Sequence, residues 1–219
     1  MQQRLALFDL DNTLLAGDSD YGWGQFMVSK GLVDGADYSA KNDAFYQDYV
    51  AGTLDMHAYA EFVLTPLTQY SATQLSNIHQ QFMASVVIPM IAPKTQALLK
   101  QHRDAGDILV IITATNDFIT GPIADYLAIP HLIATPAECV DGRYTGKLSG
   151  SPCFKEGKID KLNEWMAAEG YTIEGACFYS DSHNDIPLLA RVDKPVVVDP
   201  DTKLAAHAIA KGWPVMSLR

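Results

Sequence analysis

Basic residues are scarce in this chain of 219 residues: 16 Lys and Arg stand against 26 Asp and Glu, which gives a formal net charge of -10. Because a nucleic-acid surface needs a basic patch, we expect no nucleic-acid partner. Long hydrophobic runs are also missing, and no stretch approaches the roughly 18 apolar residues that a membrane span needs. The first residues show no signal-peptide pattern, so we expect a cytoplasmic protein with no membrane partner.

Cysteine is equally rare, and its spacing excludes the usual metal and redox motifs. Cys139, Cys153 and Cys177 lie far apart without a Cys-x-x-Cys pair, so we expect reduced, mostly buried thiols. The six histidines include no pair at the i, i+4 spacing of a helical zinc site. A zinc enzyme is therefore not expected.

The composition is that of an ordinary globular protein, with 48% hydrophobic residues. Its length permits either one large domain or a core with a smaller insert. The chain begins with a short apolar run, 5–8, which suits a strand buried on both faces of a parallel sheet. We therefore expect an α/β fold.

Two carboxylates follow this first strand, Asp9 and Asp11. Ligands of open α/β sheets bind at the carboxyl ends of strands, and residues two apart on an extended chain point the same way. Two like charges this close call for a shared proton or a hard cation such as Mg²⁺. Alternatively, one Asp caps the strand end and the other is solvated.

Helical spacing replaces strand spacing from Tyr21 to about Val87, and glycines divide this stretch into four expected helices. The sequence 71–74, Ser-Ala-Thr-Gln, predicts a capping box at the start of the last one. Four helices are too many for one crossover between parallel strands, so we expect residues 16–88 to form a helical cap domain. The core domain would then consist of residues 1–15 and 89–219, with hinges near 16–17 and 88–89.

Polar side chains also follow the later strands of the predicted sheet. The strand 107–112 runs into Thr113, whose hydroxyl could bind a phosphate oxygen, unless Thr115 or Asn116 only caps the next helix, 117–127. Strand 131–134 precedes a hairpin over 138–146 that turns at Asp-Gly. Strand 176–179 ends on a second acidic cluster, which contains Asp181 and Asp185, and strand 196–198 and helix 202–211 follow.

Three lysines surround the start of the helix that follows the hairpin. A lysine at a helix amino terminus opposes the helix dipole and is mildly unfavourable unless it serves a ligand. We expect Lys158 to bind phosphate and Lys155 and Lys161 to be solvated. Together the strand ends offer the groups needed to cleave a phosphomonoester through an aspartyl-phosphate intermediate.

These residues resemble the four ordered motifs of the haloacid dehalogenase superfamily. The motifs are Asp9-Leu10-Asp11-Asn12-Thr13-Leu14, Thr113, Lys158, and Asp181-Ser182-His183-Asn184-Asp185. The insert directly after the first motif is similar to the cap of the phosphoserine phosphatase-like branch (subfamily IB). The resemblance implies a Rossmann-like core with an inserted helical cap.

The resemblance also implies a role for each motif residue. Asp9 would be the nucleophile, and Asp11 the general acid and then the general base. Asp9, the backbone carbonyl of Asp11, and Asp181 would hold Mg²⁺, with Asp185 supporting them. The phosphate-binding residues would be Thr113, Ala114, Lys158 and Asn184. His183 has no assigned role, although it could orient Asp185.

The substrate expectation rests on a missing residue. Phosphoserine phosphatases of this branch bind the substrate ammonium with an acidic residue shortly after the first motif, and its carboxylate with a cap arginine. Asp18 stands at the acidic place, with Asp20 beside it, but no arginine lies between Arg4 and Arg103. Lys30 and Lys41 are geometrically weaker substitutes for a bidentate arginine.

An amine-bearing phosphate without a carboxylate suits this cap, and we expect histidinol phosphate. The cap aromatics Tyr21, Trp23, Phe45 and Tyr46 could stack on its imidazole, or they could form the cap core. Phosphoserine hydrolysis and phosphotransfer to a small alcohol are the alternative reactions, and a non-catalytic binding module is the alternative class. A monomer and a homodimer are both compatible with the sequence.

Overall fold

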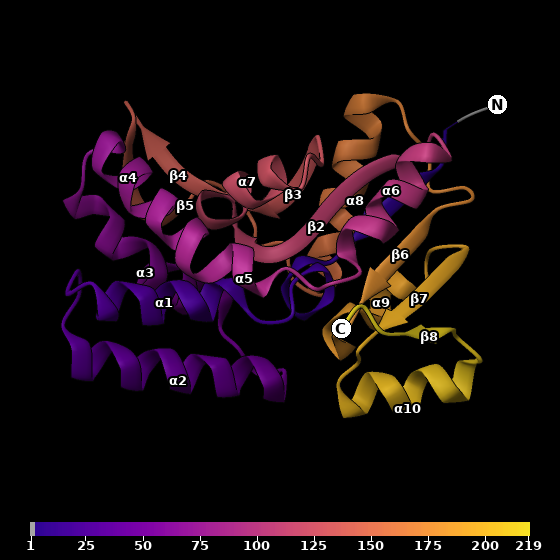
Figure 1. Cartoon of the computed structure of the whole chain (residues 1–219), viewed down its shortest axis with the longest axis horizontal. Helices are drawn as coiled ribbons and strands as arrows, with labels where there is room; N and C mark the ends of the chain where they lie inside the picture. The colour runs from indigo at the N-terminus through magenta and orange to yellow at the C-terminus, as the bar shows by residue number, and fades with distance from the viewer. Residues whose placement is uncertain (1–2) are drawn as a thin grey trace.

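The computed structural model describes residues 3–219 of the chain and places one parallel sheet at its centre (Figure 1). Within these residues the sheet has six strands in the order β3-β2-β1-β6-β7-β8. Their bounds are β1 Leu5–Phe8, β2 Ile108–Asn116, β3 His131–Thr135, β6 Cys177–Ser180, β7 Lys194–Val198 and β8 Val215–Met216. The predicted α/β class is confirmed, and the first strand of the chain lies between β2 and β6.

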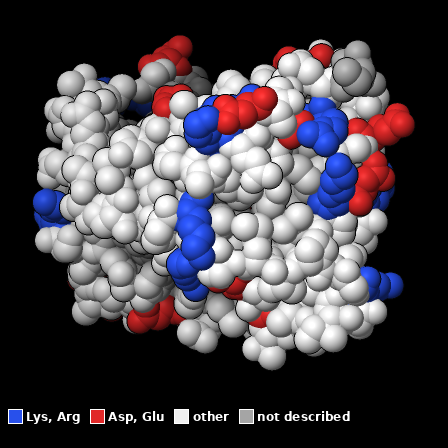
Figure 2. All heavy atoms as spheres, turned by 45° about the vertical axis from the view of Figure 1, so that its right-hand side comes forward, with Lys and Arg blue, Asp and Glu red and all other residues white. Residues whose placement is uncertain are grey.

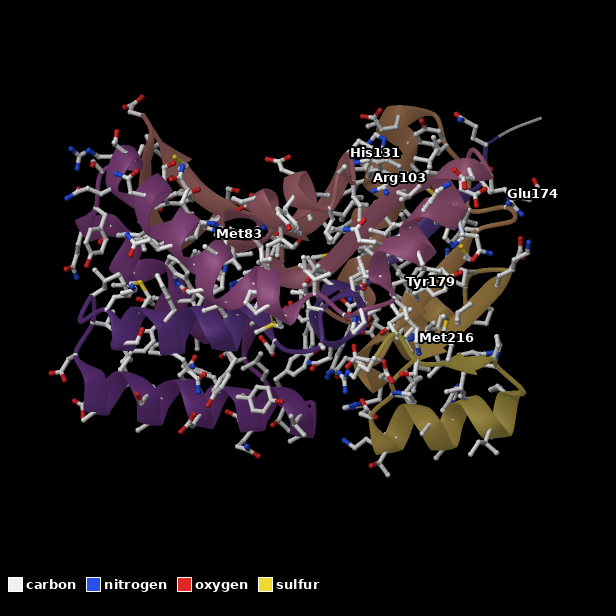
Figure 3. The ribbon with its side chains drawn as sticks, viewed as in Figure 1. Met83, Arg103, His131, Glu174, Tyr179 and Met216 are labelled. Atoms are coloured by element: carbon white, nitrogen blue, oxygen red, sulfur yellow. The ribbon has the colours of Figure 1, made fainter. Side chains whose placement is uncertain are left out.

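Both faces of the sheet are buried, as the continuous apolar run of β1 predicts. Leu5 and Leu7 pack on one face against α8 (Glu156–Glu169), α9 (Ile186–Leu189) and α10 (Thr202–Lys211). Ala6 and Phe8 pack on the other face with α6 (Thr95–Asp104), α7 (Asp117–Tyr126) and part of the insert. On this second face Tyr179 of β6, labelled in Figure 3, lies on the sheet. Its ring stacks on Phe8 with ring centroids 5.1 Å apart.

The stretch between β1 and β2 forms the four expected helices, which we call the insert. They are α1 Ser19–Ser29, α2 Gly35–Ala51, α3 Met56–Leu64 and α4 Ala72–Phe82, and the short α5, Ile88–Met90, leads back to α6. Side chains cap three of them: Asp18 caps α1, Asp55 caps α3, and Ser71 and Gln74 form the predicted capping box of α4. These caps satisfy amides that the first helical turn leaves free.

The two connections between the insert and the sheet lie side by side. The Ala16 amide donates to the Met90 carbonyl at 2.6 Å, and the Ala92 amide donates to the Leu14 carbonyl at 3.1 Å. A pair of adjacent crossings is the geometry that a hinged cap needs. The cap boundaries at residues 16 and 88 stay a prediction.

The predicted hairpin forms β4 (Ala137–Val140) and β5 (Arg143–Leu148), and its position is unexpected. Asp141 and Gly142 both have positive φ, 49° and 74°, as a tight Asp-Gly turn requires. The hairpin packs on the insert, where the Gly146 Cα lies so close to Thr65 that an added Cβ would stand 3.4 Å from its backbone. The hairpin thus joins the second half of the chain to the insert.

Among residues 3–219 no helix is long and apolar enough to cross a membrane. The face shown in Figure 2 carries Lys and Arg in separate groups beside acidic side chains and uncharged surface.

Candidate active site

A cavity lies between the carboxyl ends of the sheet strands and the insert. It is lined from the sheet side by Asp9, Asp11 and the segment 113–115. From the insert it is lined by Asp18, Asp20, Tyr21, Asn42, Phe45, Tyr46, Tyr49, Leu54, Met56 and Tyr59. The structure therefore brings the first motif, the end of β2 and both predicted substrate-binding aspartates to one cavity.

Asp9 continues β1 by one residue and lies at the floor of this cavity. Its amide donates to the Tyr179 carbonyl of β6 at 2.9 Å, and its carboxylate accepts a hydrogen bond from the Lys158 ammonium at 2.9 Å. Burial raises the pKa of the Asp9 carboxyl to about 7, although the Lys158 charge opposes this shift. A buried carboxylate beside a single cation suits attack on phosphorus once a second cation offsets its charge.

Asp11 turns toward the insert, because the chain between Leu10 and Leu14 makes an irregular turn, in which Asp11 is extended and Asn12 has a positive φ of 56°. Its carboxylate accepts from the Ser19 amide at 2.6 Å and from the Thr115 hydroxyl at 2.8 Å. Burial and then the Asp18 charge raise its pKa to about 7. A carboxyl that titrates near neutrality can both donate and accept a proton, as a general acid and base must.

Lys158 is the buried cation of the site, with 3% of its side chain exposed. Its ammonium donates to Asp9 at 2.9 Å and to Asp185 at 2.8 Å, and Asp185 also accepts from the Ser180 hydroxyl at 2.7 Å. Burial lowers the pKa of Lys158, but the charges of Asp185 and Asp9 raise it by more, so this lysine stays charged. Lys158 thus holds the first and the last acidic motifs together.

The predicted metal ligands do not form a closed site by themselves. In the described part of the chain, no three His, Cys, Asp or Glu side chains come close enough to form a ready metal site. The Asp11 side chain accepts from Ser19 and Thr115, and Asp185 shares Lys158 with Asp9. The main predicted ligands are the carboxylates of Asp9 and Asp181 and the backbone carbonyl of Asp11, and the supporting role of Asp185 stays a prediction.

These remaining donors fit a magnesium ion. Asp181 is partly buried, and burial together with the Asp9 charge raises its pKa well above the usual range. Its carboxylate is held by the Thr13 hydroxyl at 3.0 Å. Two poorly solvated carboxylates that destabilise each other's charge favour a bound cation, and Mg²⁺ commonly uses only one or two protein carboxylates and keeps several waters.

The remaining predicted residues lie at the end of β2 or against α2. Thr113 is buried, its hydroxyl accepts from the Thr115 amide at 3.2 Å, and Ala114 lies beside it in the cavity wall. Of the two possible caps, Asn116 caps α7, whereas the Thr115 hydroxyl donates to Asp11. Phosphate binding by Thr113 stays a prediction. Asn184 is buried against α2, where its side-chain amide donates to the Tyr49 carbonyl at 3.5 Å.

Several expectations are corrected by the contacts. His183 does not orient Asp185, because its ring nitrogen Nδ1 bonds Asp201 at 2.7 Å. Lys155 is not solvated, because its ammonium donates to the Gly52 carbonyl at 2.8 Å. Trp23 is fully buried among Phe26, Phe82 and Phe118 and does not line the cavity.

The carboxyl end of α2 is held at the site by donors of the second half of the chain. The carbonyls of Tyr49, Ala51 and Gly52 accept from Asn184, Lys203 and Lys155, respectively. Gly52 ends α2 with a φ of 81°, and a Cβ on it would lie 3.2 Å from His183 Nε2 and 3.5 Å from Asn184 Oδ1. Glycine thus permits both the left-handed turn and the close approach.

We expect Gly52→Ala to lower kcat/KM clearly while it lowers the free energy of unfolding only a little. The left-handed conformation should cost about 1 kcal/mol, or about 2–4 °C in Tm, and crowding against His183 and Asn184 should push α2 from the site. We expect kcat/KM to fall about fivefold. Gly31→Ala is the matched control, because Gly31 has a φ of 66° with no atom within 4 Å of its Cβ position. Equal losses of activity in both variants would contradict a role for the α2 contacts.

Sequence reasoning missed part of the insert wall. Asn42 and Tyr59 line the cavity, and the Asn42 amide donates to the Tyr21 carbonyl at 3.1 Å. Gly24 leaves room for the Asn42 side chain, because a Cβ at Gly24 would lie 2.6 Å from it. Neither Lys30 nor Lys41 reaches the cavity: Lys30 lies over the Phe26 ring, and Lys41 lines a separate hollow with Tyr38 and Phe62.

Comparisons with known proteins agree with one another. The family model of haloacid dehalogenase-like hydrolases matches residues 6–190. A histidinol-phosphatase of Neisseria meningitidis is 46% identical over 99% of this chain and 100% of its own length. A phosphoserine phosphatase of Mycobacterium tuberculosis is 29% identical over 98% of this chain and 70% of its own length.

Solved structures show the same fold. A protein of unknown function from Bordetella pertussis is 41% identical, with a TM-score of 0.94 and full coverage of both chains. A substrate-bound phosphoserine phosphatase has a TM-score of 0.70 at 15% identity, covering 94% of this chain and 90% of its own.

Proposed function

This chain belongs to the haloacid dehalogenase-like hydrolases, as its motifs indicate, and we propose that it hydrolyses L-histidinol phosphate. It is a phosphoric monoester hydrolase that acts on a small phosphate ester. The observation that carries the proposed substrate is the cavity wall: among the described residues it contains four aspartates and no Lys, Arg or His. Such a wall favours a substrate amine and disfavours a substrate carboxylate.

The proposed reaction begins with the Asp9 carboxylate. One of its oxygens attacks the phosphorus, the bond from phosphorus to the ester oxygen breaks, and the protonated Asp11 gives its proton to the leaving alkoxide. Lys158 would hold Asp9 in place and neutralise charge on the transferring group, while Thr113, the segment at Ala114 and Asn184 bind its oxygens.

The second half-reaction returns the enzyme to its starting state. Asp11, now ionised, accepts a proton from water, the water oxygen attacks the phosphorus of the aspartyl phosphate, and inorganic phosphate leaves Asp9. Asp9, Asp181 and the Asp11 carbonyl would hold the magnesium ion, which supplies Lewis-acid stabilisation of the phosphoryl oxygens. If a small alcohol replaced water in this step, the same intermediate would support phosphotransfer.

Asp18 is the proposed partner of the substrate ammonium. Its carboxylate caps α1 by accepting from the Tyr21 amide at 2.8 Å, it lies in the cavity wall, and its charge acts on Asp11. Burial raises the pKa of Asp18. An incoming substrate ammonium would therefore form an ion pair with the Asp18 carboxylate in a poorly solvated part of the cavity, which would offset the cost of burying that carboxylate.

We expect the protein to prefer histidinol phosphate over phosphoserine by about a hundredfold in kcat/KM, which corresponds to about 2.7 kcal/mol of differential transition-state binding. The two substrates share the phosphate and the ammonium, but only phosphoserine brings a carboxylate to the acidic wall. Phosphate release with Mg²⁺ would be measured for both, side by side. The reverse preference would identify phosphoserine as the substrate and disprove the proposal.

A further inference from the structure

Asp20 is a buried carboxylate that the proposed reaction does not use. It lies in the first turn of α1, 7% of the residue is exposed, and it lines the cavity. Among the contacts of residues 3–219, its Oδ1 atom has no hydrogen-bond partner. A buried carboxylate oxygen without a donor is costly, so its position points to a donor that a ligand brings.

Asp20 lies beside tyrosines of the insert. Its charge acts on Tyr59 and Tyr38, and its side chain shares a hydrogen bond with Tyr59. Burial, followed by the charges of Asp18 and Asp11, raises the pKa of Asp20 well above its usual range. Asp20 is thus a second acidic group on the insert side of the cavity, next to Asp18.

Aromatic side chains form part of the cavity wall on the insert side. Tyr59 and Phe45 both line the cavity and meet edge to face, with ring centroids 5.3 Å apart. Aromatic walls with a few polar side chains are typical of a pocket for a flat ring that carries a polar atom. A nitrogen heterocycle fits both features, because its faces stack on the walls while an N–H donates to the carboxylate.

The cavity holds one reacting carboxylate and two further carboxylates for the two nitrogen groups of the proposed substrate. In histidinol phosphate the phosphate, the ammonium and the imidazole follow one another along the carbon chain. Asp9 lies on the sheet side of the cavity, and Asp18 and Asp20 lie on its insert side. Resting on the proposed function, we propose that Asp20 is a specificity-determining residue, which accepts a hydrogen bond from the imidazole N–H of the substrate while Asp18 binds its ammonium.

The test compares two substrates that differ only in the ring. The phosphate ester of phenylalaninol keeps the phosphate and the ammonium but replaces imidazole by benzene. We expect the ratio of kcat/KM for histidinol phosphate to that for phenylalaninol phosphate to fall about thirtyfold in Asp20→Leu, which removes the acceptor at similar size, since a site built for a hydrogen bond discriminates strongly against a partner that lacks it. Asp18→Asn is the matched control, in which both values should fall and the ratio should stay within about threefold.

A second measurement guards against a purely structural effect. Binding of the product histidinol, followed by titration calorimetry, should weaken at least about tenfold in Asp20→Leu, while binding of phenylalaninol should weaken less. An unchanged ratio in Asp20→Leu together with unchanged histidinol binding would overturn the assignment of Asp20. That result would differ from failure of the proposed function, in which the unaltered protein itself would prefer phosphoserine.

Discussion

Asp9→Asn should abolish phosphate release, lowering kcat by at least about 10⁴-fold, while the protein stays folded. An amide oxygen is too weak a nucleophile for phosphorus, and the substitution leaves the shape of the site unchanged. The fold should tolerate the change because the Asp9 charge is itself costly: burial raises its pKa to about 7. Lys158 would keep Asp185 as an ionic partner at 2.8 Å.

Three measurements separate the nucleophile role from a structural one. Thermal unfolding should show a Tm within a few degrees of the unaltered protein. Acid quenching during turnover of a labelled phosphate ester should trap phosphoprotein in the unaltered chain and none in Asp9→Asn. Asp201→Asn is the control, because Asp201 bonds His183 and caps α10 and should leave turnover within a few fold. Full activity of Asp9→Asn would remove the nucleophile assignment.

The sequence was sufficient to place the groups that follow the strands. Parallel strands direct their carboxyl ends to one edge of the sheet, so residues directly after β1, β2 and β6 must converge whatever the connections do. Asp9 and Asp181 are such residues, and Thr113 lies on β2 just beyond Ile111, the last residue of β2 that pairs with β1. The order of the strands could not be predicted in the same way, because β1 pairs with β6 from the far end of the chain and no local pattern encodes that pairing.

Contacts between distant segments could not be predicted in this way. Lys158 joins Asp9 to Asp185 because α8 packs on the sheet so that the lysine ammonium reaches both carboxylates. No local sequence pattern encodes these two contacts. The same holds for Lys155, which finds a carbonyl of α2 only because the insert folds back onto the core.

The cavity-facing aromatics illustrate a second limit. Tyr21 and Trp23 are two residues apart on α1, so they project about 200° apart around the helix and cannot both face the substrate. The sequence offers both rings, and only packing decides that Tyr21 lines the cavity while Trp23 enters the core. A helix buried on both sides lacks the polar face that would reveal its orientation.

Lys158→Met should destabilise the metal-free protein by about 3–5 kcal/mol at pH 8, because it leaves buried carboxylates without their cation. The penalty should shrink to about 1–2 kcal/mol at pH 5. The folded-state pKa of Asp9 already lies near 7 and would rise further without the Lys158 charge. A carboxyl with a raised folded-state pKa costs nothing below its unfolded pKa and removes stability as the pH rises through the folded value.

The same substitution should lower kcat/KM about 10³-fold, since the cation that positions Asp9 and stabilises the transferring phosphoryl group is lost. Lys161→Met on the same helix is the control, because its ammonium lies 3.8 Å from the exposed Glu164 carboxylate and does not contact Asp9 or Asp185. Denaturant unfolding at both pH values, with a chelator present, measures the penalty. If it were equal at pH 5 and pH 8, the lost stability would come from packing of the lysine side chain, and Lys158 would matter for its shape and not for the charges that it neutralises.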